Sequence, residues 1–374
     1  MPAETIPAAT ASTATTPTRG GSTIAIVGAS ARAAAFSLLR VGKQVVAADL
    51  FADADLARHC AVTRVSPYPD GCTAWLAETE CDGWLYTGAL ENNPELVDRL
   101  TTLRPLLGHA GNVLRRVRDP LQLQAVLSRE GLHFPETRSA AEPRPTDGAW
   151  LGKTYRGSCG SGVGVAHGAL FWQRVINGTP LSAVFVGGKL LGVTRQLVGE
   201  SWACATEFKY CGSIGPWPLP TEIRQQLVHL GVVLGAEFEL KGIYGVDLMC
   251  DGERIWAIEV NPRYTAAVEV VERAYGVSVF GSQGFQRHDS PLGKVVLYAK
   301  VPLAITAELH AQLMQQTGDL NWPRLADIPV LGTEIAAGQP VLTLFAEADS
   351  CEAVARRLQQ RVDEIEQQLY GGTP

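Results

Sequence analysis

The stretch from residue 243 to residue 263 decides the fold, and it runs IYGVDLMC (243–250), DGE (251–253), RIWAIEV (254–260) and NPR (261–263). Two apolar runs flank an Asp-Gly turn, a pattern that is typical of a β-hairpin. Glu259 and Asn261 stand two positions apart, so their side chains share one face of an extended strand. We predict a three-residue turn over 251–253, which places Asp247 on that same face. A two-residue turn would move Asp247 to the other face.

The predicted hairpin separates a polar face from an apolar one. Small residues, Gly245 and Ala257, are expected on the polar face, where they leave room for a ligand. The opposite face is expected to point into the core, because the residues on it are all apolar: Val246, Leu248, Ile258 and Val260.

The polar face carries a candidate metal site. Asp247, Glu259 and Asn261 offer two carboxylates and an amide oxygen, which are ligands that suit Mg²⁺. Inward-facing carboxylates are costly unless something pairs with them. The alternative is a hairpin without metal, in which Arg254 or Arg263 forms salt bridges with these carboxylates.

A second candidate site follows the strand that ends at Lys153, where residues 157–165 run GSCGSGVGV. Successive backbone N–H groups of such a loop can surround phosphate oxygens, because glycine has no Cβ that blocks their approach. Lys153 would add a positive charge beside the phosphates. The spacing differs from the P-loop, in which the lysine follows the glycines. A flexible β-hairpin turn without a ligand is the alternative.

A third candidate lies near the start of the chain. Residues 24–28 form a short apolar run that ends at Gly28, and a helical pattern and a second strand ending at Asp49 follow. This is a βαβ unit with parallel strands. Ser30 and Ala33 stand where a dinucleotide-binding loop has its second and third glycines. The pattern therefore favours a tight structural turn over the cofactor loop of an oxidoreductase.

The chain has 374 residues, so two or three domains are expected. Residues 1–22 are rich in Ala, Thr and Pro, and we predict a disordered tail there. A Rossmann-like domain over residues 23–115, a mostly β domain over 116–285 and an α+β region over 286–374 are expected to follow. The predicted fold class is α/β and α+β.

Composition excludes several classes of protein. Hydrophobic residues make up 46% of the chain and charged residues 19%, as in a packed globular protein. The net charge of −6 and the absence of a basic run argue against nucleic acid as a partner. The sequence contains no apolar stretch of about 18 residues, so we expect no membrane-spanning helix. Eight cysteines without a Cys-x-x-Cys pair favour free thiols in a reducing compartment, so we expect a cytoplasmic protein.

Lys153, the glycine-rich loop, Asp247 and the segment EVNPR (259–263) together resemble the ATP-grasp superfamily. Within it the chain is most similar to the carboligase-like branch related to biotin carboxylase. The similar segments are FWQRVINGTPLS (171–182), NPRYT (261–265), ADIP (326–329) and GQPV (338–341). The resemblance covers about residues 23–370. It implies a Rossmann-like pre-ATP-grasp domain, ATP-grasp nucleotide-binding lobes and a small C-terminal α+β portion.

The resemblance also implies roles for these residues. Lys153 would bind the α and β phosphates of ATP, and Arg263 would stabilise charge on the transferred phosphoryl group, so both are candidate catalytic residues. The loop residues that would close over the triphosphate are Gly157, Gly160, Ser161, Gly162 and Val163. The adenine hinge would be formed by Gln173, Val175 and Ile176. The ligands of Mg²⁺, or of Mn²⁺ in its place, would be Asp247, Glu259 and Asn261.

Family members typically convert a carboxylate into an acylphosphate, which an amine or a similar nucleophile attacks. The resemblance therefore implies an ATP- and Mg²⁺-dependent ligase with small-molecule carboxylate and nucleophile substrates. Some members of the branch act in one-carbon cofactor biosynthesis, linked to methanopterin or methanofuran. The alternative is a non-catalytic ATP-grasp-like module that binds a nucleotide or another small ligand. Either protein could form a homo-oligomer.

Two positions depart from the family pattern. Many relatives carry a lysine early in the helix near residue 120, where this chain has Asp119 and Pro120. Either Arg118 replaces that lysine or one phosphate contact is missing. Relatives often have Glu at the position of Arg174. Both departures are expected to affect nucleotide affinity.

Overall fold

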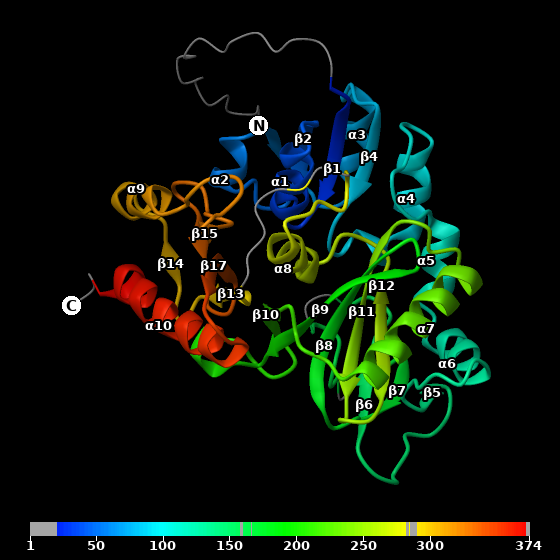
Figure 1. The fold of residues 1–374 in the computed structure, drawn as a ribbon. Coiled ribbons are helices and arrows are strands. Elements are labelled where there is room, and N and C mark those ends of the chain that lie inside the picture. Colours follow the sequence, from blue (N-terminus) through cyan, green and yellow to red (C-terminus); the bar gives the residue numbers. More distant parts are fainter. Residues whose placement is uncertain (1–20, 158–159, 166, 282–283, 285–289, 372–374) are drawn as a thin grey trace.

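The computed structural model describes residues 21–157, 160–165, 167–281, 284 and 290–371 (Figure 1). The tail predicted over residues 1–22 lies almost wholly outside this range. Figure 1 shows the first elements in blue and cyan, the middle ones in green and yellow, and the last in orange and red, as three adjoining parts.

A parallel sheet of four strands begins the described chain, in the order β3-β2-β1-β4. Its central strand β1 (Thr23–Gly28) is an apolar run that is buried from Ile24 onward, as expected where helices cover both faces of a parallel sheet. The other strands are β2 (Gln44–Asp49), β3 (Ala61–Arg64) and β4 (Gly83–Tyr86). The helices are α1 (Arg32–Arg40), α2 (Ala54–Ala57), α3 (Cys72–Glu78), the 3₁₀ turn η1 (Leu90–Asn92), α4 (Pro94–Thr101) and α5 (Gly111–Val117).

A small antiparallel sheet follows helix α6 (Pro120–Arg129). Asp119 starts this helix, because its side chain accepts hydrogen bonds from the N–H groups of Leu121 and Gln122, and Pro120 suits the first helical position. The sheet has the order β5-β7-β6, with β5 (Thr137–Ser139), β6 (Trp150–Lys153) and β7 (Phe171–Arg174).

The largest sheet has eight strands in the order β12-β11-β8-β9-β10-β13-β17-β15. Its first part contains β8 (Thr179–Val186), β9 (Lys189–Val198), β10 (Tyr210–Gly215), β11 (Ile243–Cys250) and β12 (Ile255–Asn261). Helices α7 (Thr221–Glu237) and α8 (Ala266–Tyr275) pack against it. β13 (Leu292–Tyr298) pairs with β10, so strands from both sides of the predicted boundary at residues 285/286 lie in one continuous sheet. The predicted domain boundaries stay a prediction.

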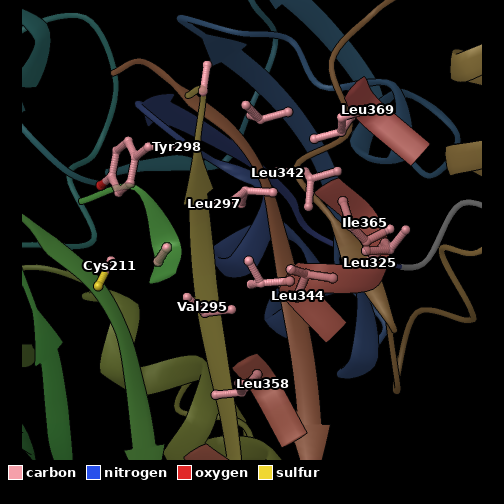
Figure 2. Packing of buried hydrophobic residues seen from close by; sticks show 14 of the residues in the cluster. Cys211, Val295, Leu297, Tyr298, Leu325, Leu342, Leu344, Leu358, Ile365 and Leu369 are labelled. Atoms are coloured by element: carbon pink, nitrogen blue, oxygen red, sulfur yellow. The ribbon is translucent and has the colours of Figure 1, made fainter. Parts of the chain in front are cut away.

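The C-terminal part of this sheet has its own core (Figure 2). β17 (Pro340–Glu347) pairs with β13, and helix α10 (Cys351–Tyr370) covers both strands with the buried residues Val354, Leu358, Val362, Ile365 and Leu369. These positions recur at helical spacing, so one stripe of the helix faces the sheet. The smaller elements are η2 (Ser201–Ala203), β14 (Leu303–Ala304), α9 (Ala307–Gln315), β15 (Leu325–Ala326) and β16 (Glu334–Ile335).

Candidate active site

The β11–β12 hairpin brings the three predicted metal ligands to one face. Asp247 lies directly opposite Glu259, and Gly245 lies opposite Asn261. Directly opposed residues of an antiparallel pair point to the same side of the sheet. The Asn261 amide Nδ2 donates to Asp247 Oδ2 at 3.0 Å, so the side chains of these two residues touch.

The predicted three-residue turn is wrong, although the predicted face is right. Cys250 pairs with Ile255, which leaves a four-residue loop over 251–254. An even loop alone would put Asp247 and Glu259 on opposite faces. The register shifts between Asp247 and Leu248, where a β-bulge adds one residue to β12 and reverses the faces again.

The bulge exchanges the predicted places of two residues. Ala257, expected on the ligand face, is 1% exposed and lies in the apolar core, opposite Leu248. Ile258, expected in the core, is partly exposed and lines the cleft described below. Val246, Leu248 and Val260 are buried in the core as predicted.

Two side-chain amides donate to the carboxylate of Asp247. Gln196 Nε2 donates to its Oδ1 at 2.8 Å, and Asn261 donates to its other oxygen. Burial and the repulsion of Glu259 raise the pKa of Asp247 to about 6, against a hydrogen bond from Ser182 and the charge of Arg263. A divalent cation between the two carboxylates would remove this repulsion.

Glu259 is paired with Arg118, the candidate replacement for the family lysine. Arg118 donates from NH1 to Glu259 Oε1 at 2.8 Å, and from NH2 to Asn92 Oδ1 at 2.9 Å. The Arg118 side chain is 10% exposed and the Glu259 side chain 45%. Arg118 thus places a fixed positive charge beside the candidate metal ligands.

The donor set fits a hard divalent cation. All candidate donors are oxygens, two from carboxylates and one from an amide, and Mg²⁺ is usually held by one or two carboxylates together with phosphates and waters. Throughout the described part of the chain, no three residues of the types His, Cys, Asp and Glu gather in a way that could hold a metal by themselves. Asn261 and oxygens of a nucleotide would therefore have to complete the shell.

Lys153 lies at the end of β6 and is held by a neutral partner. Its Nζ donates to Gln173 Oε1 at 2.6 Å. Burial lowers the pKa of the Lys153 ammonium, while the charges of Glu259 and Asp247 oppose this shift. The ammonium is therefore close enough to the hairpin carboxylates to respond to them.

The glycine-rich loop folds back over β6. Thr154 N–H donates to the Gly162 carbonyl at 3.0 Å, and Val165 N–H donates to the Gly152 carbonyl at 3.1 Å. Gly160 and Gly162 have φ values of +85° and +82°, which L-residues rarely adopt. A Cβ on Gly160 would lie 1.9 Å from the Phe208 carbonyl oxygen. Residues 158–159 of the predicted loop lie outside the described residues.

The predicted adenine hinge lines the same cleft through Gln173, Val175 and Ile176. The Gln173 side chain is 3% exposed and engaged with Lys153, and Val175 N–H donates to the Ala149 carbonyl at 2.9 Å. Arg174, the departure from the family pattern, pairs instead with Glu136 and Asp147 at 3.2 Å each.

Arg263 is anchored by the N-terminal part of the chain. Its Nε donates to Glu91 Oε1 at 2.7 Å, and its NH2 lies 3.4 Å from Asn261 Oδ1. The preceding Pro262 carbonyl accepts from the hydroxyl of Tyr86 at 3.4 Å and lies 2.9 Å from His109 Nδ1. The turn that carries Arg263 is thus fixed from β4 and the segments next to it.

One cleft of about 1330 Å³ unites these residues. Its lining includes every residue predicted for catalysis, nucleotide or metal: Lys153, Gly157, Gly160, Ser161, Gly162, Val163, Gln173, Val175, Ile176, Asp247, Glu259, Asn261 and Arg263. The cleft continues to the N-terminal turn at Ser30 and to strand β17 at Thr343. A volume of this size accommodates a nucleotide together with a further small molecule.

The Gly28 turn is structural, which is the interpretation that the sequence favoured. Asp49 is fully buried, and its carboxylate accepts from the N–H groups of Ala31 at 2.5 Å, Phe51 at 2.6 Å and Ala52 at 2.9 Å. A carboxylate used in this way holds the turn together.

Sequence reasoning missed several residues that hold the site. Gln196 follows Thr194 and Arg195 in strand β9, so a polar residue there was only a weak signal of a polar site. Glu91, the partner of Arg263, and Asn92, the partner of Arg118, lie in a short 3₁₀ turn far away in the sequence. Nothing near them in the sequence points to these partners.

The fold and the cleft define a class of protein, one in which a small sheet with a glycine-rich loop faces a larger sheet across a cleft that polar and charged side chains enter. Residues 117–267 match the ATP-grasp domain family. Residues 117–267 therefore carry an ATP-grasp domain, which confirms the predicted superfamily for this part of the chain, and the predicted fold class is confirmed as well. An uncharacterized protein of Methanocaldococcus jannaschii is 21% identical over 175 residues, which are 47% of this chain. The chain spans only 42% of that relative's length.

Solved structures share the fold at low identity. N5-carboxyaminoimidazole ribonucleotide synthetase in complex with ADP is 17% identical, with a TM-score of 0.67 over 93% of this chain and 98% of that chain. Biotin carboxylase from Campylobacter jejuni is 13% identical, with a TM-score of 0.66 over 90% of this chain and 89% of that chain. L-amino acid ligase from Bacillus licheniformis is 14% identical, with a TM-score of 0.65 over 93% of this chain and 98% of that chain.

Two further observations concern the residues that the structure describes. The seven cysteines among the described residues are free thiols. Over the same residues, no helix has both the length and the apolar character that crossing a bilayer requires.

Proposed function

We propose that the protein is an ATP- and Mg²⁺-dependent ligase. Its carboxylate substrate would attack the γ-phosphorus of ATP, which forms an acylphosphate and releases ADP. An amine or similar nucleophile would then attack the acyl carbon, forming the new bond and releasing phosphate. The structural relatives are named as synthetases, carboxylases and ligases that act on small molecules, in line with this reaction class.

The residues of the cleft suit this reaction. Lys153 binds the inner phosphates, and the loop from Gly157 to Val163 covers them with backbone N–H groups. Bound Mg²⁺ would supply charge neutralisation for the phosphates and would be held by Asp247, Glu259 and Asn261. Arg263 stabilises charge on the transferred phosphoryl group, and Glu91 keeps its guanidinium in place.

One observation carries the proposal: Asp247 and Glu259 lie opposite each other on the face that also carries Asn261, in the cleft that Lys153 and Arg263 line. Calorimetric titration with ATP tests it, with and without Mg²⁺. We expect Mg²⁺ to raise the affinity. Equal affinity under both conditions would remove the metal role, and no ATP binding at all would contradict the ligase.

The pathway is a finer proposal. A step in the biosynthesis of a one-carbon cofactor of the methanopterin or methanofuran type rests on the family resemblance alone. A cytoplasmic location rests on the cysteine usage alone. Mass spectrometry of metabolites from a deletion strain tests the pathway, because the missing ligase should leave its carboxylate substrate unconsumed. Accumulation of an unrelated carboxylate would reassign the pathway and keep the reaction class.

A further inference from the structure

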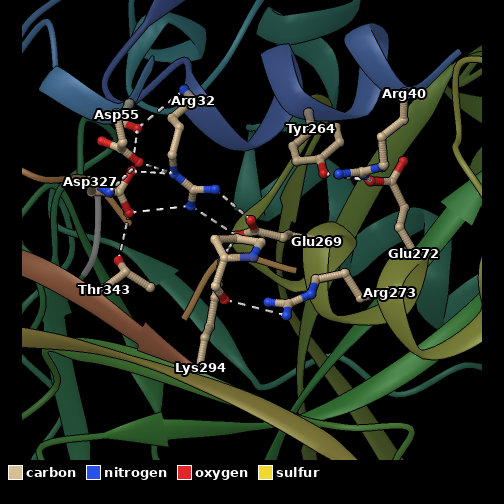
Figure 3. A network of polar contacts seen from close by, with 12 residues as sticks. Arg32, Arg40, Asp55, Tyr264, Glu269, Glu272, Arg273, Lys294, Asp327 and Thr343 are labelled. Atoms are coloured by element: carbon tan, nitrogen blue, oxygen red, sulfur yellow. Dashed lines mark hydrogen bonds and ion pairs between the residues drawn. The ribbon is translucent and has the colours of Figure 1, made fainter. Parts of the chain in front are cut away.

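A cluster of carboxylates lies at the end of the cleft that is formed by the N-terminal turn and strand β17, and all of them are buried except Asp327, whose side chain is 23% exposed. Its members come from the N-terminal segment, helix α8 and the C-terminal part, and they are Asp49, Asp53, Asp55, Glu269 and Asp327. Figure 3 shows Asp55, Glu269 and Asp327 around the guanidinium of Arg32. Two cations bond directly to this cluster, Arg32 and Lys294. Carboxylates therefore outnumber the cations that they hold.

Four of the five carboxylates are fully engaged. Glu269 accepts from Arg32 at 2.6 Å and from Lys294 at 2.8 Å. Asp327 accepts from Arg32 at 2.8 Å, from the Thr343 hydroxyl at 2.6 Å and from the Ser30 hydroxyl at 3.1 Å. Asp55 accepts the N–H groups of residues 327 and 328, and Asp49 closes the Gly28 turn as described above.

Asp53 is the exception. The residue is 4% exposed and lines the cleft, yet within the described part of the chain its buried Oδ2 has no hydrogen-bond partner. Asp53 precedes helix α2 at the position where an aspartate normally accepts from the helix N-terminus, but its side chain makes no such bond. Buried polar atoms are nearly always paired, so an unpaired carboxylate oxygen at a cleft indicates a partner that a ligand supplies.

The charge around Asp53 selects the kind of ligand. Burial and the charges of Asp327, Asp49 and Asp55 raise the pKa of Asp53 well above its usual range, and Arg32 only partly opposes this. An anionic ligand would add to the repulsion, whereas a cation would relieve it. Because the described residues contain no set of acidic side chains suited to a metal, an organic cation fits better than a metal ion.

We propose that Asp53 binds the ammonium group of a small amine and accepts its proton, which frees the nitrogen lone pair to act as the nucleophile of the ligase reaction; this inference rests on the proposed function. The amine end of the cleft adjoins its phosphate end. Ala29, Ser30 and Gly88 line the cleft, and a Cβ on Gly88 would lie 3.8 Å from the guanidinium carbon of Arg263. An amine held at Asp53 is therefore in the same cleft as the residue proposed to act on the phosphoryl group.

Matched pairs of small molecules test the amine site. Benzylamine, phenethylamine and putrescine are titrated into the protein by calorimetry at about pH 8, beside benzyl alcohol, phenethyl alcohol and butanediol. We expect at least one amine to bind, and its alcohol not to. In Asp53→Asn the amine affinity should fall about tenfold to a hundredfold, as expected for a lost charge-assisted hydrogen bond. Asp70→Asn is the control, because Asp70 is exposed and is not among the cleft residues.

Thermal unfolding separates a ligand-binding role from a structural one. Asp53→Asn removes a repelled charge, so its melting temperature without ligand should rise at about pH 8. The proposal is overturned if no amine of the panel binds, if the variant binds amines as the wild type does, or if the variant melts lower. ATP affinity is measured on the same samples. Asp53-dependent amine binding without any ATP binding would end the ligase proposal and leave the amine site standing.

Discussion

Lys153 carries the buried positive charge that the proposed function assigns to phosphate binding. Its ammonium is buried, its close partner is the neutral amide oxygen of Gln173, and burial lowers its pKa. A phosphate group would provide the full negative charge that this position lacks.

Replacement of this lysine is expected to weaken ATP binding. A charge-assisted hydrogen bond is worth about 1.5–3 kcal/mol, so Lys153→Ala should raise the Kd for ATP roughly tenfold to over a hundredfold. The fold should persist, because a lysine at a strand end is not part of the apolar core. Lys189→Ala, at an exposed strand start, is the control. An unchanged Kd in Lys153→Ala would reject the phosphate contact.

The carboxyl of Asp247 predicts a pH dependence. Its pKa is raised to about 6, so it is mostly protonated below that pH and ionised above it. A metal ion requires the ionised form, and the Mg²⁺-dependent part of ATP affinity should therefore grow as the pH rises through about 6. Calorimetric titration with ATP, with and without Mg²⁺, measures this dependence between about pH 5 and pH 8.

Asp247→Asn supplies the control for this profile. Without an ionisable group at position 247, the gain between about pH 5 and pH 8 should disappear. The sign for stability is the reverse. A carboxyl group whose pKa is raised in the folded state stabilises the fold at low pH, and this stabilisation is lost as the pH rises through about 6. Above that pH the unliganded variant should therefore be more stable than the unliganded wild type. A pH profile that the substitution leaves intact would assign the titration to another group.

At the scale of elements, the glycine-rich loop depends on backbone that only glycine adopts easily. Gly160→Ala would place a methyl group against the Phe208 carbonyl at a φ of +85°, so the loop should lose its place over β6. We expect ATP affinity to fall at least about tenfold with little change in unfolding temperature. Calorimetry and thermal unfolding measure the two effects.

Gly168→Ala is the matched control for this loop. Gly168 has a φ of +74°, but a Cβ there meets nothing within 4 Å. Gly168→Ala therefore has the same kind of backbone strain as Gly160→Ala, but its methyl group collides with no other atom. If both variants lose ATP affinity equally, strain alone explains the effect and the contact with Phe208 is irrelevant.

The β11–β12 hairpin shows what a sequence can and cannot predict. Alternation of polar and apolar residues predicted the two strands and the common face of Asp247, Glu259 and Asn261. It did not predict the bulge at Ile258, because an apolar residue suits the core and the cleft wall equally. Loop length and bulge compensate each other, so the correct face followed from an incorrect turn.

Pairings between distant segments escaped prediction for another reason. The ion pairs of Arg263 with Glu91 and of Arg32 with Glu269 and Asp327 join residues far apart in sequence. Their partners depend on how three parts of the chain pack. Local patterns therefore indicated the candidate metal ligands, and tertiary packing determines which residues hold them in place.

At the scale of the whole molecule, Arg32 ties three parts of the chain together. Its guanidinium bonds to Glu269 on α8 and to Asp327 in the C-terminal part (Figure 3). Removing one partner of a buried ion pair leaves uncompensated charge and typically costs about 3–5 kcal/mol. Arg32→Ala should therefore lower the free energy of unfolding by about this amount, measured by urea denaturation.

Arg115→Ala is the comparison for this prediction. Arg115 also pairs with two carboxylates, Glu95 and Asp98, but the side chains of all three are exposed. Surface ion pairs contribute little, so its unfolding midpoint should stay close to that of the wild type. Equal losses in the two variants would show that burial adds nothing to the Arg32 network.

The continuous eight-stranded sheet has a consequence for how the chain is made on the ribosome. β10 pairs on one side with β9, but its other neighbour, β13, is synthesised only after helices α7 and α8 and the β11–β12 hairpin. At about 5–20 residues per second, the edge of β10 waits several seconds for its partner. During that time an unpaired strand is exposed to other nascent chains and to chaperones. Cellular yield of the protein should therefore depend on translation speed between β10 and β13 as much as on the stability of the finished fold.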